Sequence, residues 1–408
     1  MKRILLFVVL LALLSSLSCG LLTVPITPAL FSTSTVKVNT QVSPTQDITL
    51  STATNSSFSR YQKMCLNIQE APVKDFSFTG KILLSTTEIN RIDRKIYTLS
   101  QSNNNPSILI DEVYGDMIIS PDGKWLAYNF LLDDQADQRM KSFKIISLDG
   151  KPEQEIHYGM THYDLRDWLD NKRIVMYSYT KNLLVLDIST NQTDEIDITS
   201  PEYGIGTDGF GYQSVNPALD RMVYYRSLPV SEFPSAVLWD LENKREISRL
   251  DLRADLLWHN LSQWSPDGSS FAVAGPVEIF DNVLELFLVD QNGKIRQLTH
   301  IQEEAGLERG VIDHPTWSPD GRYIAFWLEN SLAVFDTVAE KVIDYCLPSS
   351  NAMSSSPYWS LDSNQIVFNI DSSLSGPGPV IVVDINENRA VEVAGSQYYV
   401  EGWMIENP

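Results

Sequence analysis

Aromatic and ionisable side chains recur at one place in a repeated sequence pattern, and with them this chain could bind or transform a ligand. The pattern is marked by positions 119, 168, 215, 264, 317, 359 and 403, of which five are tryptophan. Five residues before these marker positions stand, in order, Tyr114, Tyr163, Phe210, His259, Ile312, Ser354 and Tyr398. Rings of this kind stack on peptides and sugars, and Asp164, Asn260, Asp313 and Glu401 are candidate polar partners. The sequence therefore predicts a ligand-binding site there, with wedging of the rings between repeats as the structural alternative.

The same stretch carries groups that could transfer protons. They are the Tyr163 phenol, the imidazoles of His162 and His259, and the carboxyl groups of Asp164 and Asp313, all side chains that act as acids and bases in enzymes. A polysaccharide lyase or hydrolase is therefore the alternative to a non-catalytic binding protein that takes a protein, peptide or glycan. A scaffolding domain within an envelope assembly is the third alternative.

Metal and cofactor sites are not predicted. The five histidines form no His-x-x-x-His pair and have no cysteine nearby, which argues against zinc. Residues 133–137 are acidic but lack the ligand spacing of a calcium-binding EF-hand loop. Residues 204–209 match the letters of a dinucleotide fingerprint, but the flanking sequence predicts neither the preceding strand nor the following helix that such a site needs.

Each marker position opens a turn that leads into a buried strand. Ser318-Pro319-Asp320-Gly321 suits a type I turn, because proline presets φ and the small polar side chains hydrogen-bond locally. Residues 323–328 follow with apolar side chains on both faces, as in a strand between two other sheets. Further copies begin at Ser120, Ser265 and Ser360, and weaker ones follow positions 168 and 215.

A later strand in each repeat ends on an acid, at Asp149, Asp187, Asp240, Asp290, Asp336 and Asp384, before a polar turn and a short outer strand. Four short strands per repeat of 42–53 residues indicate a β-propeller blade. The last repeat is cut off after its inner strand near position 403, and residues 80–110 supply three strands that lack one. We therefore predict an all-β fold, a single propeller of seven four-stranded blades over residues 75–408, closed by pairing of its N- and C-terminal strands. An eight-bladed ring or an open array is the alternative.

The Trp-Ser-Pro-Asp-Gly turns, the Ile-Ala-Phe strand and the later Val-Val-Asp strand resemble the WD-like repeats of TolB-type β-propellers. The resemblance implies the fold and no particular chemistry, since one fold hosts many functions. TolB precedes its propeller with an α/β domain that the low-complexity N-terminal residues here cannot form, so a role in the Tol-Pal system is not expected. The chain also contains no Gly-x-Ser-x-Gly elbow of a propeller peptidase.

The N-terminus predicts export. Lys2 and Arg3 precede an apolar run and a small-residue end, which is the pattern of a signal segment over residues 1–18. The Ser18-Cys19 pair resembles a bacterial lipoprotein signal, which implies lipidation of Cys19, with cleavage and secretion as the alternative. Residues 19–74 are rich in Ser and Thr and are predicted to be a flexible tether. We expect a monomeric propeller on the outer face of a bacterial membrane.

Charge and cysteine count restrict the partners further. The formal net charge of −21 disfavours nucleic acid and anionic membrane surfaces, so contact with the membrane is expected through the lipid alone. With Cys19 acylated, Cys65 and Cys346 remain as an even pair in a compartment that permits disulfides. They are predicted either to form a bridge or to remain two buried thiols.

Overall fold

The structure is a computed structural model of the whole chain. It describes residues 60–70, 75–86, 94–113, 115, 117–131, 141–148, 154–156, 163–178, 182–198, 213–226, 235–252, 263–278, 281–307, 310–348, 356–371 and 377–406. The predicted signal, Cys19 and most of the predicted tether lie outside these residues, as do the acidic stretch 133–137 and the glycine-rich stretch 204–209.

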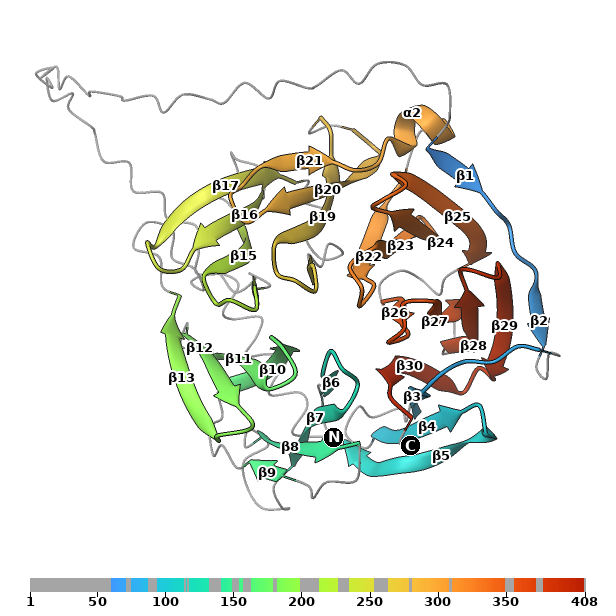
Figure 1. The fold of residues 1–408 in the computed structure, drawn as a ribbon, viewed down its shortest axis with the longest axis horizontal. Helices are drawn as coiled ribbons and strands as arrows, with labels where there is room; N and C mark the ends of the chain where they lie inside the picture. The colour runs from blue at the N-terminus through green and yellow to red at the C-terminus, as the bar shows by residue number, and fades with distance from the viewer. Residues whose placement is uncertain are drawn as a thin grey trace, which may run out of the picture. The chain divides into compact units, whose positions relative to one another are not determined.

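Seven sheets, each with four antiparallel strands, are arranged as the blades of a β-propeller, which confirms the predicted fold (Figure 1). The innermost strands of blades 1 to 7 are β30 (Tyr398–Met404), β6 (Met117–Ile119), β10 (Tyr163–Trp168), β14 (Gln213–Val215), β18 (Gln263–Trp264), β22 (Ile312–Trp317) and β26 (Tyr358–Trp359). The second strands are β3 (Lys81–Thr86), β7 (Trp125–Leu131), β11 (Arg173–Ser178), β15 (Arg221–Arg226), β19 (Ser270–Pro276), β23 (Tyr323–Leu328) and β27 (Gln365–Asp371).

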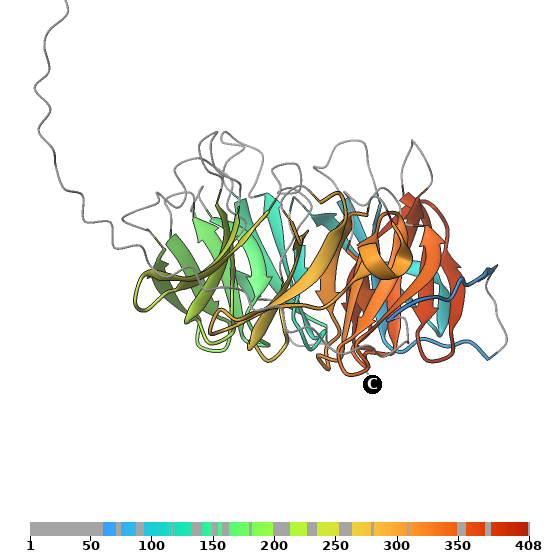
Figure 2. The same cartoon turned by 90° about the horizontal axis from the view of Figure 1, so that it is seen from above.

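The outer half of each blade follows the same order. The third strands are β4 (Arg94–Ser100), β8 (Lys141–Ser147), β12 (Asn182–Asp187), β16 (Ser235–Asp240), β20 (Leu284–Asp290), β24 (Ser331–Asp336) and β28 (Pro377–Asp384). The fourth strands are β5 (Asn103–Val113), β9 (Gln154–Ile156), β13 (Gln192–Asp197), β17 (Arg245–Asp251), β21 (Ile295–Gln297), β25 (Lys341–Pro348) and β29 (Arg389–Ala394). Seen from the side, the strands run between the two rims of the ring (Figure 2).

Blade 1 closes the ring with both ends of the propeller sequence. The C-terminal strand β30 pairs antiparallel with β3, from Lys81 opposite Met404 to Thr86 opposite Tyr398. Strands β4 and β5 then complete the blade. The predicted pairing of N- and C-terminal strands is therefore confirmed, and it leaves blade 1 with four strands, like blades 2 to 5.

The repeated turn is held by a local hydrogen-bond pattern. In blade 6 the Ser318 hydroxyl donates to Asp320 at 2.6 Å and accepts the Tyr323 amide at 2.9 Å, while the Gly321 amide donates to the Ser318 carbonyl at 2.9 Å. Gly321 has φ +73°, a left-handed conformation that glycine adopts without strain. The same three contacts recur around Ser120, Ser265 and Ser360.

The marker tryptophans join neighbouring blades. In four of the five, the indole Nε1 donates to the carbonyl that precedes the marker position of the preceding blade, over 3.0–3.4 Å: Trp168 to Ile118, Trp264 to Ser214, Trp317 to Gln263, and Trp359 to Thr316. Trp403 differs, because it donates to the Thr79 carbonyl at the start of its own blade. A tryptophan at this position thus packs between two sheets and satisfies its N–H there.

The acids that end the third strands cap the turns that follow them. Carboxylate oxygens of Asp187, Asp240, Asp290, Asp336 and Asp384 accept backbone amides two to four residues further on, at 2.8–3.2 Å. Between the turns, the second and third strands bury apolar side chains on both faces, as in β23, whose adjacent and buried Phe326 and Trp327 pack into different cores. Each blade therefore shares its core with both neighbours.

Two short strands precede the propeller that the sequence predicts from residue 75. Strand β1 (Tyr61–Lys63) pairs in parallel with β25, and β2 (Ile68–Glu70) pairs in parallel with β29, so blades 6 and 7 have five strands. These residues fall inside the range 19–74 assigned to the tether, because isolated three-residue strands leave no periodic signal. A short helix, α2 (Ile301–Ala305), follows β21. No helix within the described residues is long and apolar enough to cross a membrane.

Candidate functional site

The predicted site residues divide by where they fall in the chain. Tyr114, Phe210, His259 and Asn260 lie outside the described residues, and of Tyr163 and Asp164 only the backbone is described, at the start of β10. Asp313, Tyr398 and Glu401 can be placed fully. Tyr163, Ile312 and Tyr398 are the first residues of their innermost strands, as predicted. We call the rim at which these strands begin the entry rim; the Ser-Pro-Asp-Gly turns lie at the opposite rim.

Tyr398 packs between strands. Its ring meets the Tyr97 ring edge-on, with centroids 5.4 Å apart, and it lies against the core shared by blades 7 and 1. Its backbone carbonyl accepts the Asn369 side-chain amide of blade 7 at 2.8 Å. Ile312 at the equivalent position of blade 6 is completely buried. At these two positions the side chains serve the packing of the ring.

Three innermost strands are irregular at equivalent places. The register with the second strand shifts between Leu165 and Asp167 in β10 and between Asp313 and Thr316 in β22. In β30 it shifts at Glu401, which lies between the paired residues Val400 and Gly402. In β22 the irregularity includes His314 at φ +50°, which is uncommon for a residue other than glycine. Bulges re-aim side chains next to functional sites, so these three places are where the inner strands can present a side chain towards a ligand.

Glu401 is the centre of a polar cluster at its bulge. It accepts hydrogen bonds from the Ser85 hydroxyl and from Arg94, whose Nη1 lies 3.0 Å from Oε1. The second guanidinium nitrogen of Arg94 donates to the carbonyl of Gly115, just before β6 of blade 2. The side chains of Arg94 and Glu401 keep 23% and 17% of their surface exposed, so the pair is neither sealed in the core nor free in solvent.

Enclosure by protein changes the acidity of this cluster. Desolvation raises the pKa of Glu401 above its usual range, against the opposing effects of Arg94 and Ser85. The pKa of the neighbouring Tyr358 phenol, on the innermost strand of blade 7, is also raised, first by burial and then by the charge of Glu401. The Arg94–Glu401 cluster thus lies where blades 7, 1 and 2 meet.

Two aspartates on innermost strands have acidities suited to proton exchange near neutral pH. Burial raises the pKa of Asp313 to about 7, and its side chain is 3% exposed. Asp167 keeps contact with solvent, but desolvation by the protein that surrounds it raises its pKa to about 6, against the opposing hydrogen bond from the Trp168 amide. Shifted carboxyl groups of this kind are frequent at functional sites, although structural acids also show them.

Sequence reasoning missed Arg94, Ser85, Tyr358 and Asp167. Asp167 and Tyr358 directly precede marker tryptophans, so an alignment of that position would have found them. Arg94 and Ser85 belong to strands outside the repeated turn, and only the folded ring brings them to Glu401. No group of three or more His, Cys, Asp or Glu side chains within the described part of the chain could hold a metal ion.

No model of a known protein family matches the sequence, and neither does any curated protein. Solved structures do match. The chain is similar to the β-propeller domain of the Trilobed protease from Pyrococcus furiosus, with a TM-score of 0.53 and 12% identity over 81% of this chain and 98% of that one. The chain is a seven-bladed β-propeller.

Two further matches have lower TM-scores. An oligogalacturonate lyase in complex with manganese matches with a TM-score of 0.49 and 15% identity over 78% of this chain and 86% of that one. A protein assigned as TolB from Agrobacterium tumefaciens matches with a TM-score of 0.41 and 17% identity over 64% of this chain and 92% of that one. At such identities these likenesses concern the fold alone, and the function has to be argued from the residues.

Proposed function

We propose that this protein is an exported, surface-tethered propeller that binds a peptide, protein or glycan without transforming it. The observation that carries the proposal is the Arg94–Glu401 cluster at the entry-rim end of the inner strands. Its two charges neutralise each other, and together with the Ser85 hydroxyl they offer both donors and acceptors. Such a surface suits uncharged polar groups, namely backbone amides or sugar hydroxyls, better than a free ion.

Pre-organisation supports the same function. Three neighbouring blades hold the cluster, because Glu401 belongs to blade 1, Tyr358 to blade 7, and Arg94 reaches Gly115 before blade 2. A ligand therefore meets groups that are already fixed, which reduces the ordering cost of binding. Glu401 was predicted as a polar partner at the mouth of the ring; Arg94 and Tyr358 extend that prediction.

The test begins with capture of ligands from the native envelope by the soluble body from residue 60 onward. The captured ligand is then titrated by calorimetry against an Arg94→Gln/Glu401→Gln double variant, which removes both charges and leaves neither uncompensated. We expect at least a tenfold loss of affinity. The matched control is Arg296→Gln/Glu340→Gln, an exposed ion pair of 3.1 Å on the outer wall. Equal affinity in all three proteins, each with an unchanged melting temperature, would refute the site.

The raised pKa values of Asp167 and Asp313 support an enzyme as the second candidate. Carboxyl groups that titrate near pH 6–7 suit general acid–base catalysis on a polysaccharide or peptide. Turnover of a panel of both substrate classes would be measured for the native protein and for Asp167→Asn and Asp313→Asn. Activity that falls at least a hundredfold in either variant, but not in the exposed-acid control Asp111→Asn, would select the enzyme over the binding protein.

Tethering is the remaining part of the proposal. Cleavage before Cys19 and its lipidation would leave about 40 residues between the membrane and Arg60. Fatty-acid labelling of the native protein and of Cys19→Ser tests this, because the variant should lose the label and leave the membrane fraction. A labelled or membrane-bound Cys19→Ser protein would refute lipidation at this residue.

A further inference from the structure

Residues 60–70, which we call the strap, run along the outside of the ring (Figures 1 and 2). The strap adds β1 to the outer edge of blade 6 and β2 to that of blade 7. Backbone hydrogen bonds on both sides of β1 hold the strap to blade 6. The Val342 amide donates to the Arg60 carbonyl at 2.7 Å, and the Met64 amide donates to the Asp344 carbonyl at 2.8 Å. The strap also covers the β25 and β29 edges, which would otherwise offer unpaired backbone groups.

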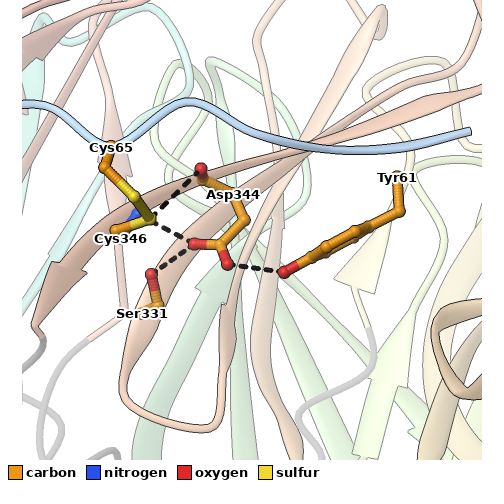
Figure 3. Close-up of a disulfide and its surroundings, with 5 residues drawn as sticks. All are labelled: Tyr61, Cys65, Ser331, Asp344 and Cys346. Carbon is orange, nitrogen blue, oxygen red and sulfur yellow. Dashed lines mark hydrogen bonds between the residues drawn. A yellow bond between two sulfur atoms is a disulfide. The ribbon is translucent and has the colours of Figure 1, made fainter. Parts of the chain in front are cut away.

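A disulfide joins the middle of the strap to blade 6 (Figure 3). Cys65 and Cys346, the pair that the cysteine count singled out, have Cα atoms 4.7 Å apart. Asp344 organises the surroundings: it is buried and accepts hydrogen bonds from the Tyr61 hydroxyl at 2.7 Å, the Ser331 hydroxyl at 2.6 Å and the Cys346 amide at 2.8 Å.

The backbone of blade 6 is distorted at this place. Cys346 has φ +55°, a conformation that side chains other than glycine rarely adopt, and the register between β24 and β25 shifts between Ser331 and Ala333. Such outliers persist only where the surroundings hold them, and Asp344 holds this one through the Cys346 amide. The irregular backbone and the disulfide occur at the same residue, which indicates a feature built for the bond to the strap.

The position of the disulfide in the chain decides how a pull on the N-terminus travels. The first strand after the strap that belongs to a blade is β3, which closes the ring by pairing with β30. Cys65 precedes both β2 and β3 in the chain. With the disulfide intact, tension from the N-terminal side passes from Cys65 into Cys346 and blade 6. Without it, tension would peel the three-residue pairings of β1 and β2 and then act directly on β3.

We propose that the Cys65–Cys346 disulfide is a mechanical stop, which transfers tension from the N-terminal tether to blade 6 and keeps it off the strand that closes the ring. The inference rests on the tethered binding function proposed above, because only a protein that holds a ligand while anchored is pulled in this way. The force enters through the proposed lipid anchor at Cys19. The disulfide keeps the propeller closed while a bound ligand is pulled away from the membrane.

Single-molecule pulling tests the stop. The chain from residue 19 onward, with Cys19→Ser, carries one handle at its N-terminus and one at position 242, in the exposed turn between β16 and β17. We expect the oxidised protein to release only residues 60–64, which precede Cys65, before its blades unfold. The same protein under reductant, and Cys65→Ser/Cys346→Ser, should show an additional step at lower force. Release of residues 66–80, which the disulfide otherwise protects, predicts about 5 nm, at roughly 3.3–3.6 Å per residue.

An early step of the same size and force in the oxidised protein would overturn the proposal, and so would its absence after reduction. Reduction of the native chain keeps the test valid should the double variant fold poorly. Ligand binding by the untethered body in solution is a separate readout. We expect the disulfide variant to bind the ligand as the native protein does. If the proposed function is wrong, the native protein itself will bind no ligand, while the force steps stay as predicted.

Discussion

Glu285 on β20 stabilises the connection between blades 5 and 6, and its removal is the sharpest stability test of this structure. The side chain is 1% exposed. Its Oε2 accepts the Thr299 hydroxyl at 2.6 Å and the Ile301 amide at 2.9 Å, and its Oε1 accepts the Gln302 amide at 3.0 Å. The two amides belong to the first turn of α2, so a strand side chain supplies the helix cap that His300 does not.

The expected cost follows from the groups that lose an acceptor. Glu285→Ala leaves the Ile301 amide and the Thr299 hydroxyl buried without an acceptor, which costs about 1–3 kcal/mol for each donor. The Gln302 amide can donate to water instead. We therefore expect a loss of about 3–5 kcal/mol in the free energy of unfolding. Glu285→Gln retains one oxygen but turns an N–H towards a donor, so about 1–3 kcal/mol is expected.

Guanidinium-induced unfolding, followed by tryptophan fluorescence, measures both variants. The matched control is Glu303→Ala, an exposed acid in the same helix, for which a change within about 0.5 kcal/mol is expected. A Glu285→Ala protein as stable as the control would refute the reasoning. An order in which Gln costs more than Ala would show that the repulsion between its amide N–H and the facing donors outweighs the one acceptor that it keeps.

Three further outcomes are expected. Reduction of the Cys65–Cys346 disulfide, which closes a loop of 281 residues, should lower the free energy of unfolding by up to about 5 kcal/mol, and an unchanged denaturation midpoint would contradict this. Trp359→Phe removes the 3.0 Å bond to the Thr316 carbonyl and should lower stability by about 1–2 kcal/mol in the same assay; a melting curve identical to the native one would count against the inter-blade bond. The Asp167 carboxyl has its pKa raised from an ordinary 3.8 to about 6, so the folded protein binds its proton more tightly than the unfolded chain does. This contribution is lost as pH rises from about 4 to 6; Asp167→Asn should therefore be more stable than the native protein at pH 8 and equal to it near pH 3.5, and parallel pH profiles would argue against the shift.

The parts of the candidate site that could be predicted are those defined by residues close together in the sequence. Glu401 was found because it lies two residues before a marker tryptophan, and its bulge occurs where two other inner strands are also irregular. Its partners Arg94 and Ser85 are separated from it by 307 and 316 residues. Tyr398 was predicted at the correct end of its strand, but only its contact with Tyr97 shows that its aromatic ring packs between strands.

The sequence by itself determined the blade. The turn at Ser318 closes through contacts with Asp320, Gly321 and Tyr323, all within five residues, and the acid at Asp336 caps the next turn within three. Such contacts need only the local chain, so their residue types recur visibly from repeat to repeat. The number of blades followed from counting these repeats.

Tertiary structure decided everything that joins one part of the ring to another. The parallel pairing of β1 with β25, the disulfide between residues 65 and 346, and the Arg94–Glu401 pair each link segments about 280 or more residues apart. Those contacts form only when the closed ring brings the segments together, and each occurs once, so no repeat in the sequence records them. The polar cluster and the strap are therefore properties of the closed propeller, whereas each blade can be predicted from its own repeat.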